Sequence, residues 1–375
     1  MAALLTPQGR GAVATIRLVG ECALLDRGEP ALFRAVSGRP LASQPLGRIV
    51  FGHWGSEPSE EVVVCRHGDG TTEIHCHGGD LAARRILAEL ESAGCRIVPW
   101  QQLGITETSL LETECREVLA NACTLRTADI LLEQCSGRLL AAFEALRQVA
   151  EAADVAASEL LPQIDELLER ADFGLHLSAP WKVVILGRPN VGKSSLLNAL
   201  AGFARAIVFD EPGTTRDVVT AETAFQGWPV RLIDTAGIRE AESPLETAGI
   251  ALARDAAESA DCQLLVIDIS QPPQPEDRDL LAAWPRAVVV AHKADLPDVW
   301  EEKVPAEALR VSSSTGTGLE DLMAEIVKRL VPRVPEPATA IPVTLRQIEL
   351  LKDARQSVLD GNLAGSRKVL GGLLR

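Results

Sequence analysis

The stretch Gly187-Arg188-Pro189-Asn190-Val191-Gly192-Lys193-Ser194 decides how this chain folds. It follows the apolar run 183–186 and precedes the segment 195–200, an order that indicates a buried strand, a glycine-rich turn and the start of a helix. In such a turn several backbone N–H groups and the helix N-terminus converge on phosphate groups. The sequence therefore predicts a phosphate-binding loop. Lys193 would reach the β- and γ-phosphates, and the Ser194 hydroxyl would bind Mg²⁺.

Further apolar runs at 230–233, 263–267 and 287–290 are nearly continuous, as expected for parallel strands that are buried on both faces. Strand and helix signals alternate from Trp181 to about Leu330. This alternation predicts a doubly wound α/β domain of about 150 residues, with a mostly parallel sheet.

A short acidic motif, Asp234-Thr235-Ala236-Gly237, stands at the end of the run 230–233. There Asp234 can hold Mg²⁺, usually through a water molecule, and the Gly237 N–H can sense a γ-phosphate. Between this motif and the phosphate loop lies Gly-Thr-Thr-Arg-Asp at 213–217, in which Thr215 is predicted to be the second protein ligand of Mg²⁺. A chance match to the first motif remains the alternative, but several ordered motifs at strand ends argue against it.

The tetrapeptide His292-Lys293-Ala294-Asp295 occupies the place of the guanine-reading motif Asn-Lys-x-Asp. The Asp295 carboxylate would accept hydrogen bonds from N1–H and the exocyclic amine of guanine, whereas adenine would leave it unpaired. His292 replaces the usual Asn, which in this fold bridges the base and the phosphate loop, so weaker nucleotide binding is expected. The run Ser312-Ser313-Ser314 fits the last guanine-contacting loop.

Composition narrows the class of protein. The net charge of −15 and the pI of about 5.0 argue against a broadly basic nucleic-acid surface, although local contacts to RNA stay open. The eight cysteines contain no Cys-x-x-Cys pair, which favours buried free thiols in a reducing cytosol over disulfides or a zinc site. No apolar segment approaches the roughly 18 to 20 residues of a membrane span, and the N-terminus lacks a signal peptide. We expect a cytoplasmic protein with no membrane segment.

The flanking regions differ from the central domain. Residues 1–105 combine short β-rich runs with one helical stretch at 80–93, which predicts an α+β domain. His75 and His77 fall on one face of a strand and invite a metal interpretation. Because no third ligand is evident nearby, a strand that enters the Gly78-Gly79 turn is favoured.

Helical periodicity dominates 106–171 and returns at 345–363, with a linker expected near Phe173-Gly174 and 178–180. Prolines between 332 and 342 predict a stiff connector. The α/β domain is therefore predicted to be inserted into a helical domain whose two parts pack together. The predicted domains are 1–105 (α+β), 106–178 (first helical part), 179–333 (P-loop GTPase) and 334–375 (second helical part).

The chain resembles the MnmE (TrmE) family of tRNA-modifying GTPases. The resemblance rests on Gly-Arg-Pro-Asn-x-Gly-Lys-Ser-Ser at 187–195, Gly-Thr-Thr-Arg-Asp at 213–217 and Asp-Thr-Ala-Gly-Ile-Arg-Glu at 234–240. It extends to Thr-Pro-Gln-Gly-Arg-Gly at 6–11 and to the His-Gly-Gly turn at 77–79, and so covers nearly the whole chain. Era and Der GTPases share the central motifs but not these flanks.

The resemblance implies a GTPase that cycles between GTP and GDP. The residues expected to line its GTP site are Asn190, Val191, Gly192, Lys193, Ser194, Ser195, Phe209, Asp210, Glu211, Pro212, Gly213, Thr214, Thr215, Asp234, Thr235, Ala236, Gly237, His292, Lys293, Asp295, Ser312, Ser313 and Ser314.

The resemblance also implies GTP-dependent dimerisation of the GTPase domains, aided by K⁺. Asn190, Glu211 and Thr214 would hold the K⁺, while Phe209 stands where a Thr is common. Ras-like switches orient the attacking water with a Gln that is Ile238 here. By position Glu246 would take over that role beside Lys193 and Thr215; a solvated surface carboxylate is the alternative interpretation of Glu246.

For the N-terminal domain the resemblance implies a constitutive homodimer and a formyl-tetrahydrofolate site, with Arg17 and Glu73 as contacts. Two departures stand out. The family's Lys in Leu-Asn-x-Lys-Leu-Asp-Leu has no counterpart in 119–123, and the printed sequence reaches Arg375 without the family's Cys-x-Gly-Lys.

Three functions follow as hypotheses. The first is a GTPase that acts with an MnmG-like flavoprotein to install an aminomethyl-type group at the wobble uridine, U34, of certain tRNAs. The second is a divergent GTPase switch or scaffold that has lost the folate-dependent chemistry. The third, a ribosome-assembly GTPase, is less favoured because no basic RNA-binding domain is visible.

Overall fold

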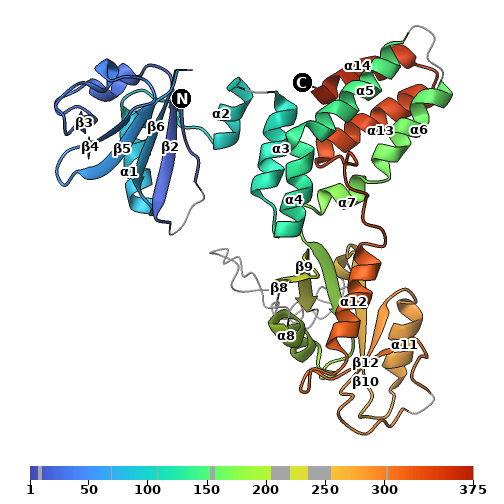
Figure 1. Ribbon diagram of the computed structural model, residues 1–375. Coiled ribbons are helices and arrows are strands. Elements are labelled where there is room, and N and C mark those ends of the chain that lie inside the picture. Colours follow the sequence, from blue (N-terminus) through green and yellow to red (C-terminus); the bar gives the residue numbers. More distant parts are fainter. Residues whose placement is uncertain are drawn as a thin grey trace. The chain divides into compact units, whose positions relative to one another are not determined.

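The computed structural model describes residues 1–6, 11–68, 70–107, 109–152, 157–203, 220–234, 255–300 and 303–374. The chain forms two compact units, residues 1–113 and residues 114–375. Most of their elements are labelled in Figure 1.

The first unit is built on a six-stranded sheet in the order β1-β2-β6-β5-β4-β3, in which every neighbouring pair is antiparallel. The buried side chains of β2 alternate along the strand, as a sheet with one covered face requires. Helix α1 packs its Ile86 and Leu90 into the same core as Ile16 and Ile74 of the sheet. The elements of this unit are β1 (Ala2–Leu4), β2 (Val13–Val19), β3 (Phe33–Ala35), β4 (Ile49–Trp54), β5 (Glu60–Arg66), β6 (Thr71–His77), α1 (Asp80–Ser92), α2 (Trp100–Glu107) and the short 3₁₀ turns Cys22–Asp26 and Leu41–Ser43.

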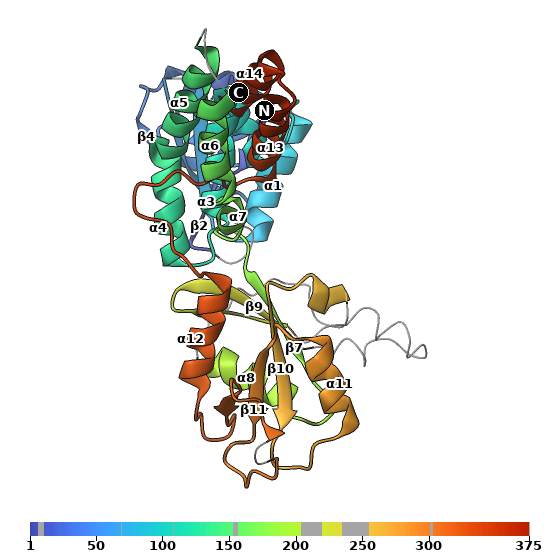
Figure 2. The same ribbon diagram turned by 90° about the vertical axis from the view of Figure 1, so that its right-hand side faces the viewer.

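The second unit contains the predicted α/β domain. Its six-stranded sheet has the order β12-β11-β10-β7-β9-β8, and all neighbouring strands are parallel except the edge pair β8–β9. Helices α8 and α12 lie on one face and α11 on the other (Figure 2). This doubly wound, mostly parallel sheet confirms the predicted fold class. Its elements are β7 (Trp181–Leu186), α8 (Lys193–Phe203), β8 (Thr220–Phe225), β9 (Trp228–Asp234), β10 (Cys262–Asp268), α11 (Pro275–Ala283), β11 (Val288–His292), β12 (Leu309–Val311) and α12 (Leu319–Leu330).

The strand register brings the motifs to one edge of this sheet. Asp234 of β9 lies beside Ile185 of β7, and His292 of β11 lies between Asp268 of β10 and Val311 of β12. In open parallel sheets the carboxyl ends of the strands form the ligand-binding edge. Side chains that are far apart in sequence therefore meet there.

The helical part of this unit combines two distant stretches of sequence. Helix α13 packs on α6 and α14 packs on α5, so the last helices lie beside those that precede the sheet (Figure 1). Arg346 and Glu114 form a two-pronged ion pair across these stretches, with N–O distances of 2.5 and 2.8 Å. The α/β domain is thus inserted into a helical domain. The helical elements are α3 (Leu110–Ala120), α4 (Leu125–Glu133), a π turn (Gln134–Arg138), α5 (Leu139–Glu151), α6 (Ala157–Leu168), α7 (Ala171–Leu175), α13 (Leu345–Leu359), α14 (Leu363–Gly371) and a 3₁₀ turn (Gly372–Leu374).

One sequence expectation was wrong in its detail. Phe173 and Gly174, expected in a linker, lie inside the short helix α7. A Cβ on Gly174 would collide with the backbone carbonyl of Pro342. The glycine therefore allows the proline-rich connector to approach the helix closely, a constraint that comes from tertiary packing and not from local flexibility.

All eight cysteines are free thiols, four of them buried and four half-buried. Burial raises the pKa of Cys76 and Cys262 to about 11. These two thiols stay protonated near neutral pH and are poor nucleophiles. In the described part of the chain no helix has the length and hydropathy that crossing a membrane requires.

The end of α7 provides a pH-dependent contribution to stability. The His176 ring stacks on Trp181, with ring centroids 4.7 Å apart, and its Nε2 lies 3.6 Å from Oδ1 of Asp261. Burial alone would lower the pKa of His176, but the hydrogen bond and charge of Asp261 outweigh burial and raise that pKa. A histidine whose pKa is raised by folding stabilises the fold fully when the pH is below the ordinary histidine pKa. This stabilisation is lost as the pH rises through the raised pKa.

We therefore expect His176→Phe, which keeps the ring stack, to lower the free energy of unfolding by about 0.5 to 1 kcal/mol more at about pH 5.5 than at about pH 9. Urea unfolding at both pH values measures this difference. The Ala179 carbonyl, 3.3 Å from Nδ1 of His176, also raises the pKa of His176, so the loss of its hydrogen bond adds to this difference in the same direction. An equal loss at the two pH values would contradict the assignment.

Candidate nucleotide-binding site

The phosphate loop follows β7 directly and has the backbone that its sequence predicts. Gly187, Asn190 and Gly192 all have positive φ angles, of 143°, 63° and 100°. A Cβ on Gly187 would lie 2.5 Å from the carbonyl oxygen of Val266, so the close approach of β10 requires glycine there. The loop curls tightly between strand and helix, which is the geometry that directs backbone N–H groups at an anion.

Lys193 begins helix α8 and turns back into this loop. Its side chain is buried, and Nζ donates hydrogen bonds to the carbonyl oxygens of Gly187 and Arg188 at 3.1 and 2.9 Å. The loop carbonyls thus hold the ammonium group at its centre, within reach of any anion that the loop binds. Ser195 follows in the first turn of α8 and is exposed.

Gly192 is constrained from outside the loop. A Cβ at this position would lie 2.5 Å from Nδ1 of His292, and the φ of 100° is strained for any L-residue. We expect Gly192→Ala to weaken GTP binding by a factor of about 100 or more, because the residue must shift by about 1 Å and strain its backbone. The control is Gly202→Ala near the end of α8, where the new methyl group would have open space around it. This variant should bind GTP normally. Titration calorimetry measures both, and equal affinity in both variants would refute this steric role.

The structure brings together Ser194 and Asp234, two of the residues predicted to bind Mg²⁺. The Ser194 Oγ donates to Oδ2 of Asp234 at 2.5 Å; the serine is exposed and the aspartate is fully buried. A hydroxyl and a carboxylate oxygen form a donor set that suits Mg²⁺, which prefers oxygen ligands. Asp234 ends β9, and Ser194 lies in the first turn of α8, directly after the phosphate loop.

Asp295 and the serine loop form the opposite side of the site. Oδ2 of Asp295 accepts a hydrogen bond from Ser314 Oγ at 3.0 Å, and Ser312 Oγ lies 2.9 Å from Ser314 Oγ. Hydrogen bonds from Ser312, its own backbone and Ser314 lower the pKa of Asp295. The carboxylate is therefore ionised near neutral pH. It is also exposed, so it can accept hydrogen bonds from a ligand.

Lys293 has a partner that was not predicted from the sequence. Its Nζ donates to Oδ2 of Asp268 at 2.6 Å, and Asp268 is 1% exposed at the end of β10. Burial opposes ionisation of Asp268, but the hydrogen bonds from Lys293 and Ser270 outweigh it and lower its pKa. The signal available in the sequence was that Asp268 directly follows the apolar run 263–267. The ion pair holds the ends of β10 and β11 together below the base-reading loop.

The partner of Arg188 in the phosphate loop was also not predicted from the sequence. The Arg188 Nε donates to Oδ1 of Asp277 at 2.6 Å, and Asp277 is 1% exposed in the first turn of α11. The loop is thereby tied to a helix on the other side of the sheet. Nothing in the local sequence around 188 indicates this partner.

Several predicted site residues lie outside the described residues. These are Phe209, Asp210, Glu211, Pro212, Gly213, Thr214, Thr215, Thr235, Ala236, Gly237 and Glu246.

In the first unit, Arg17 and Glu73 face each other across β2 and β6. Arg17 Nη2 donates to Glu73 Oε1 at 2.9 Å, and the two residues are register partners. Nε2 of His67 and Nε2 of His75 lie 3.4 and 3.7 Å from the other carboxylate oxygen. Burial raises the pKa of Glu73, but Arg17 and His67 outweigh burial, so that the net shift is downward and the carboxylate is charged.

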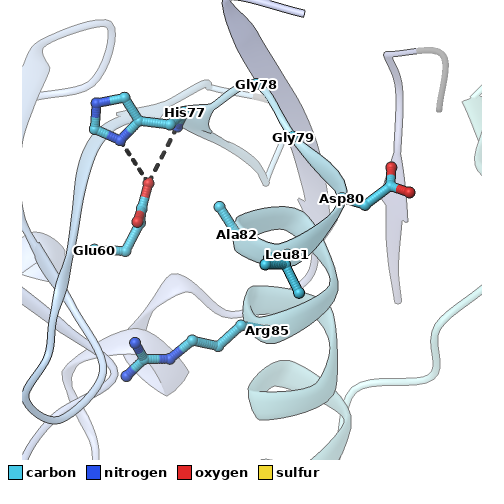
Figure 3. A pocket seen from close by; sticks show the side chains of 8 residues that line it. All are labelled: Glu60, His77, Gly78, Gly79, Asp80, Leu81, Ala82 and Arg85. Atoms are coloured by element: carbon cyan, nitrogen blue, oxygen red, sulfur yellow. Dashed lines mark hydrogen bonds and ion pairs between the residues drawn. The ribbon is translucent and has the colours of Figure 1, made fainter. Parts of the chain in front are cut away.

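The His77-Gly78-Gly79 turn lines a pocket of about 630 Å³ (Figure 3). His77 Nδ1 lies 2.6 Å from Glu60 Oε1, whereas His75 Nδ1 lies 3.0 Å from Thr15 Oγ1. The two imidazoles thus have separate partners. Among the described residues no three acidic, histidine or cysteine side chains gather as a metal site would require. Strand β6 ends at His77 and the glycines lead into α1, which is the strand and turn that the sequence favoured.

The phosphate loop, the Ser194–Asp234 pair and the Asp295 loop at one edge of a parallel sheet define a P-loop GTPase. The model of a family described as 50S ribosome-binding GTPase matches residues 182–293. The tRNA modification GTPase MnmE of Geobacillus thermodenitrificans is 36% identical over 345 residues, which cover 79% of this chain and 73% of that protein. The protein of the same name from Thermus thermophilus is 33% identical over 390 residues, or 94% and 87% of the two chains. This chain belongs to the MnmE family of tRNA modification GTPases.

Among solved structures, the G domain of the FeoB iron transporter of T. maritima is 30% identical and covers 40% of this chain and 98% of its own, with a TM-score of 0.30.

Proposed function

We propose that this chain hydrolyses GTP with Mg²⁺ and K⁺ and that its GTPase cycle serves tRNA modification together with an MnmG-like flavoprotein. The modification would be an aminomethyl-type group at the wobble uridine, U34. The observation that carries the proposal is the convergence of Lys193, the Ser194–Asp234 pair and Asp295 on one sheet edge in a member of the MnmE family. These groups supply what a phosphate chain, its metal and a guanine each need.

The chain's own residues suit the phosphoryl-transfer roles proposed for them. Lys193 would exchange its two carbonyl partners for the phosphates, and Ser194 and Asp234 would hold Mg²⁺ together with Thr215. When bound, Mg²⁺ neutralises charge that develops between the β- and γ-phosphates. Glu246 is proposed to orient the attacking water, since Ile238 has no polar group for that task.

K⁺ is proposed to bind at the outer rim of the phosphate loop. Of its three proposed ligands, Asn190, Glu211 and Thr214, only Asn190 lies within the described residues. Asn190 is exposed in a left-handed turn and carries a side-chain oxygen, a ligand type that suits an alkali cation. The proposed dimerisation of GTPase domains on GTP would complete this site.

The Arg17–Glu73 pair is proposed to contact a formyl-tetrahydrofolate in a homodimer of the first unit. A guanidinium group can pair with the carboxylates of a folate, and a carboxylate can accept hydrogen bonds from the N–H groups of its pterin ring. Both side chains are half-buried on the sheet, at 31% and 21% exposure, so a ligand can reach them.

Mass spectrometry of wobble uridines tests the proposal, with tRNA from cells that lack this gene. The modification should disappear, return on re-expression of the wild-type chain, and stay absent with the Lys193→Ala variant. If deletion leaves the wobble uridines unchanged, the proposed function is wrong. The alternative hypothesis would then apply, in which the chain is a divergent GTPase switch or scaffold with a role other than this modification.

A further inference from the structure

His292 occupies an unusual position between two loops of the site. It ends β11, is 3% exposed, and directs one ring nitrogen to each loop. Nδ1 lies 2.9 Å from the carbonyl oxygen of Val191 in the phosphate loop, and Nε2 lies 2.7 Å from Oγ of Ser313 in the serine loop. A single side chain thus joins the phosphate-binding and base-reading sides of the site.

The partners determine where the protons lie. A carbonyl oxygen only accepts hydrogen bonds, so Nδ1 of His292 must donate. Burial lowers the pKa of His292, which keeps the ring neutral. A neutral imidazole has one donor and one acceptor, so Nε2 must accept from the Ser313 hydroxyl. Both nitrogens of the ring are then used by the protein itself.

The ring also fills the space beneath the phosphate loop. A Cβ on Gly192 would collide with it, which shows that the imidazole lies against the loop backbone at the residue before Lys193. The contact with Gly192 and the hydrogen bond to the Val191 carbonyl hold this part of the loop from one side. A side chain without a ring would leave that space unfilled.

We propose that His292 is a positioning residue that clamps the phosphate loop to the serine loop and gives no hydrogen bond to the base. Guanine carries two ring-edge acceptors, O6 and N7, beside the donors that Asp295 reads. With its single N–H committed to Val191, His292 can serve neither acceptor. An Asn at 292 has two amide N–H groups, so one could hold Val191 while the other served the base.

The test compares the dissociation constants of GTP and 7-deaza-GTP, in which a C–H replaces the acceptor N7. The wild-type protein should bind the two nucleotides within a factor of about two, because no protein donor from residue 292 reads N7. The His292→Asn variant should prefer GTP by a factor of about five to ten, the value of one hydrogen bond. A wild-type preference for GTP of fivefold or more, or no preference in His292→Asn, would overturn the proposal.

The clamp itself is tested through Ser313. Ser313→Ala leaves Nε2 of His292 buried without a donor and should weaken both nucleotides equally, by a factor of about five to ten. In the His292→Asn background the same serine change should have little further effect, since the His–Ser bond is already absent. The control is Ser259→Ala, at an exposed serine outside the predicted site. It should leave the affinity for both nucleotides unchanged. Equal effects of Ser313→Ala in both backgrounds would refute the clamp.

Thermal unfolding of each variant shows whether that variant is folded. If His292→Asn does not fold, the comparison of GTP with 7-deaza-GTP in the wild-type protein still decides whether His292 contacts the base. The inference deepens the GTP-binding part of the proposed function and is independent of tRNA. Absence of GTP binding by the wild-type protein would contradict the proposed function, whereas GTP binding with a clear preference over 7-deaza-GTP would contradict only the role given to His292.

Discussion

Lys193→Ala is expected to lower kcat/KM for GTP hydrolysis by a factor of about 10² to 10³, comparable with the loss of one preorganised charge at a reacting group. The reason is the place of the ammonium group. It is buried inside the phosphate loop and held there by the carbonyl oxygens of Gly187 and Arg188. A low-dielectric position strengthens its attraction to phosphate oxygens. Steady-state phosphate release measures the change.

Lys182→Ala is the matched control, because Lys182 is an exposed lysine near the start of β7, the strand that leads into the phosphate loop. Its removal changes the net charge equally but takes nothing from the phosphate loop. Hydrolysis by this variant should remain within a factor of about two of the wild type. If both lysine variants lost activity to the same extent, long-range charge and not the loop position would explain the effect.

Asp295→Asn should change the base that the site accepts. The carboxylate is exposed and bonded to Ser314, and we propose that it accepts two hydrogen bonds from guanine. An asparagine offers one acceptor and one donor, a pattern that matches xanthine, which has a carbonyl where guanine has an amine. We expect GTP affinity to fall by a factor of about 100 or more and the affinity for xanthosine triphosphate to rise by a similar factor.

Competition binding with both nucleotides measures this exchange. Asp279→Asn serves as the control, since Asp279 is exposed on α11 and makes the same change of charge and shape. It should leave the preference for GTP intact. Loss of GTP binding in Asp295→Asn without a gain for xanthosine triphosphate would mean that Asp295 supports the loop but does not read the base.

The sequence by itself determined the class of fold and the family, because the decisive signals are local. A glycine-rich turn between an apolar strand and a helix needs only contiguous residues to form its anion-binding backbone. Near-continuous apolar runs likewise identify parallel strands without knowledge of their partners. The glycine-rich turn and the apolar runs together predict one sheet edge that carries Lys193, Ser194, Asp234 and Asp295.

Only the tertiary structure decided which side chains pair. His292 joins Val191 and Ser313, Lys293 pairs with Asp268, and Arg188 pairs with Asp277, and in each case a partner comes from a distant segment. The role of Gly174 also depended on a distant segment, the connector at Pro342. Periodicity reports which face of an element is buried, but not which element covers it. The partner of a polar side chain is set by strand order and register, and these are properties of the assembled sheet.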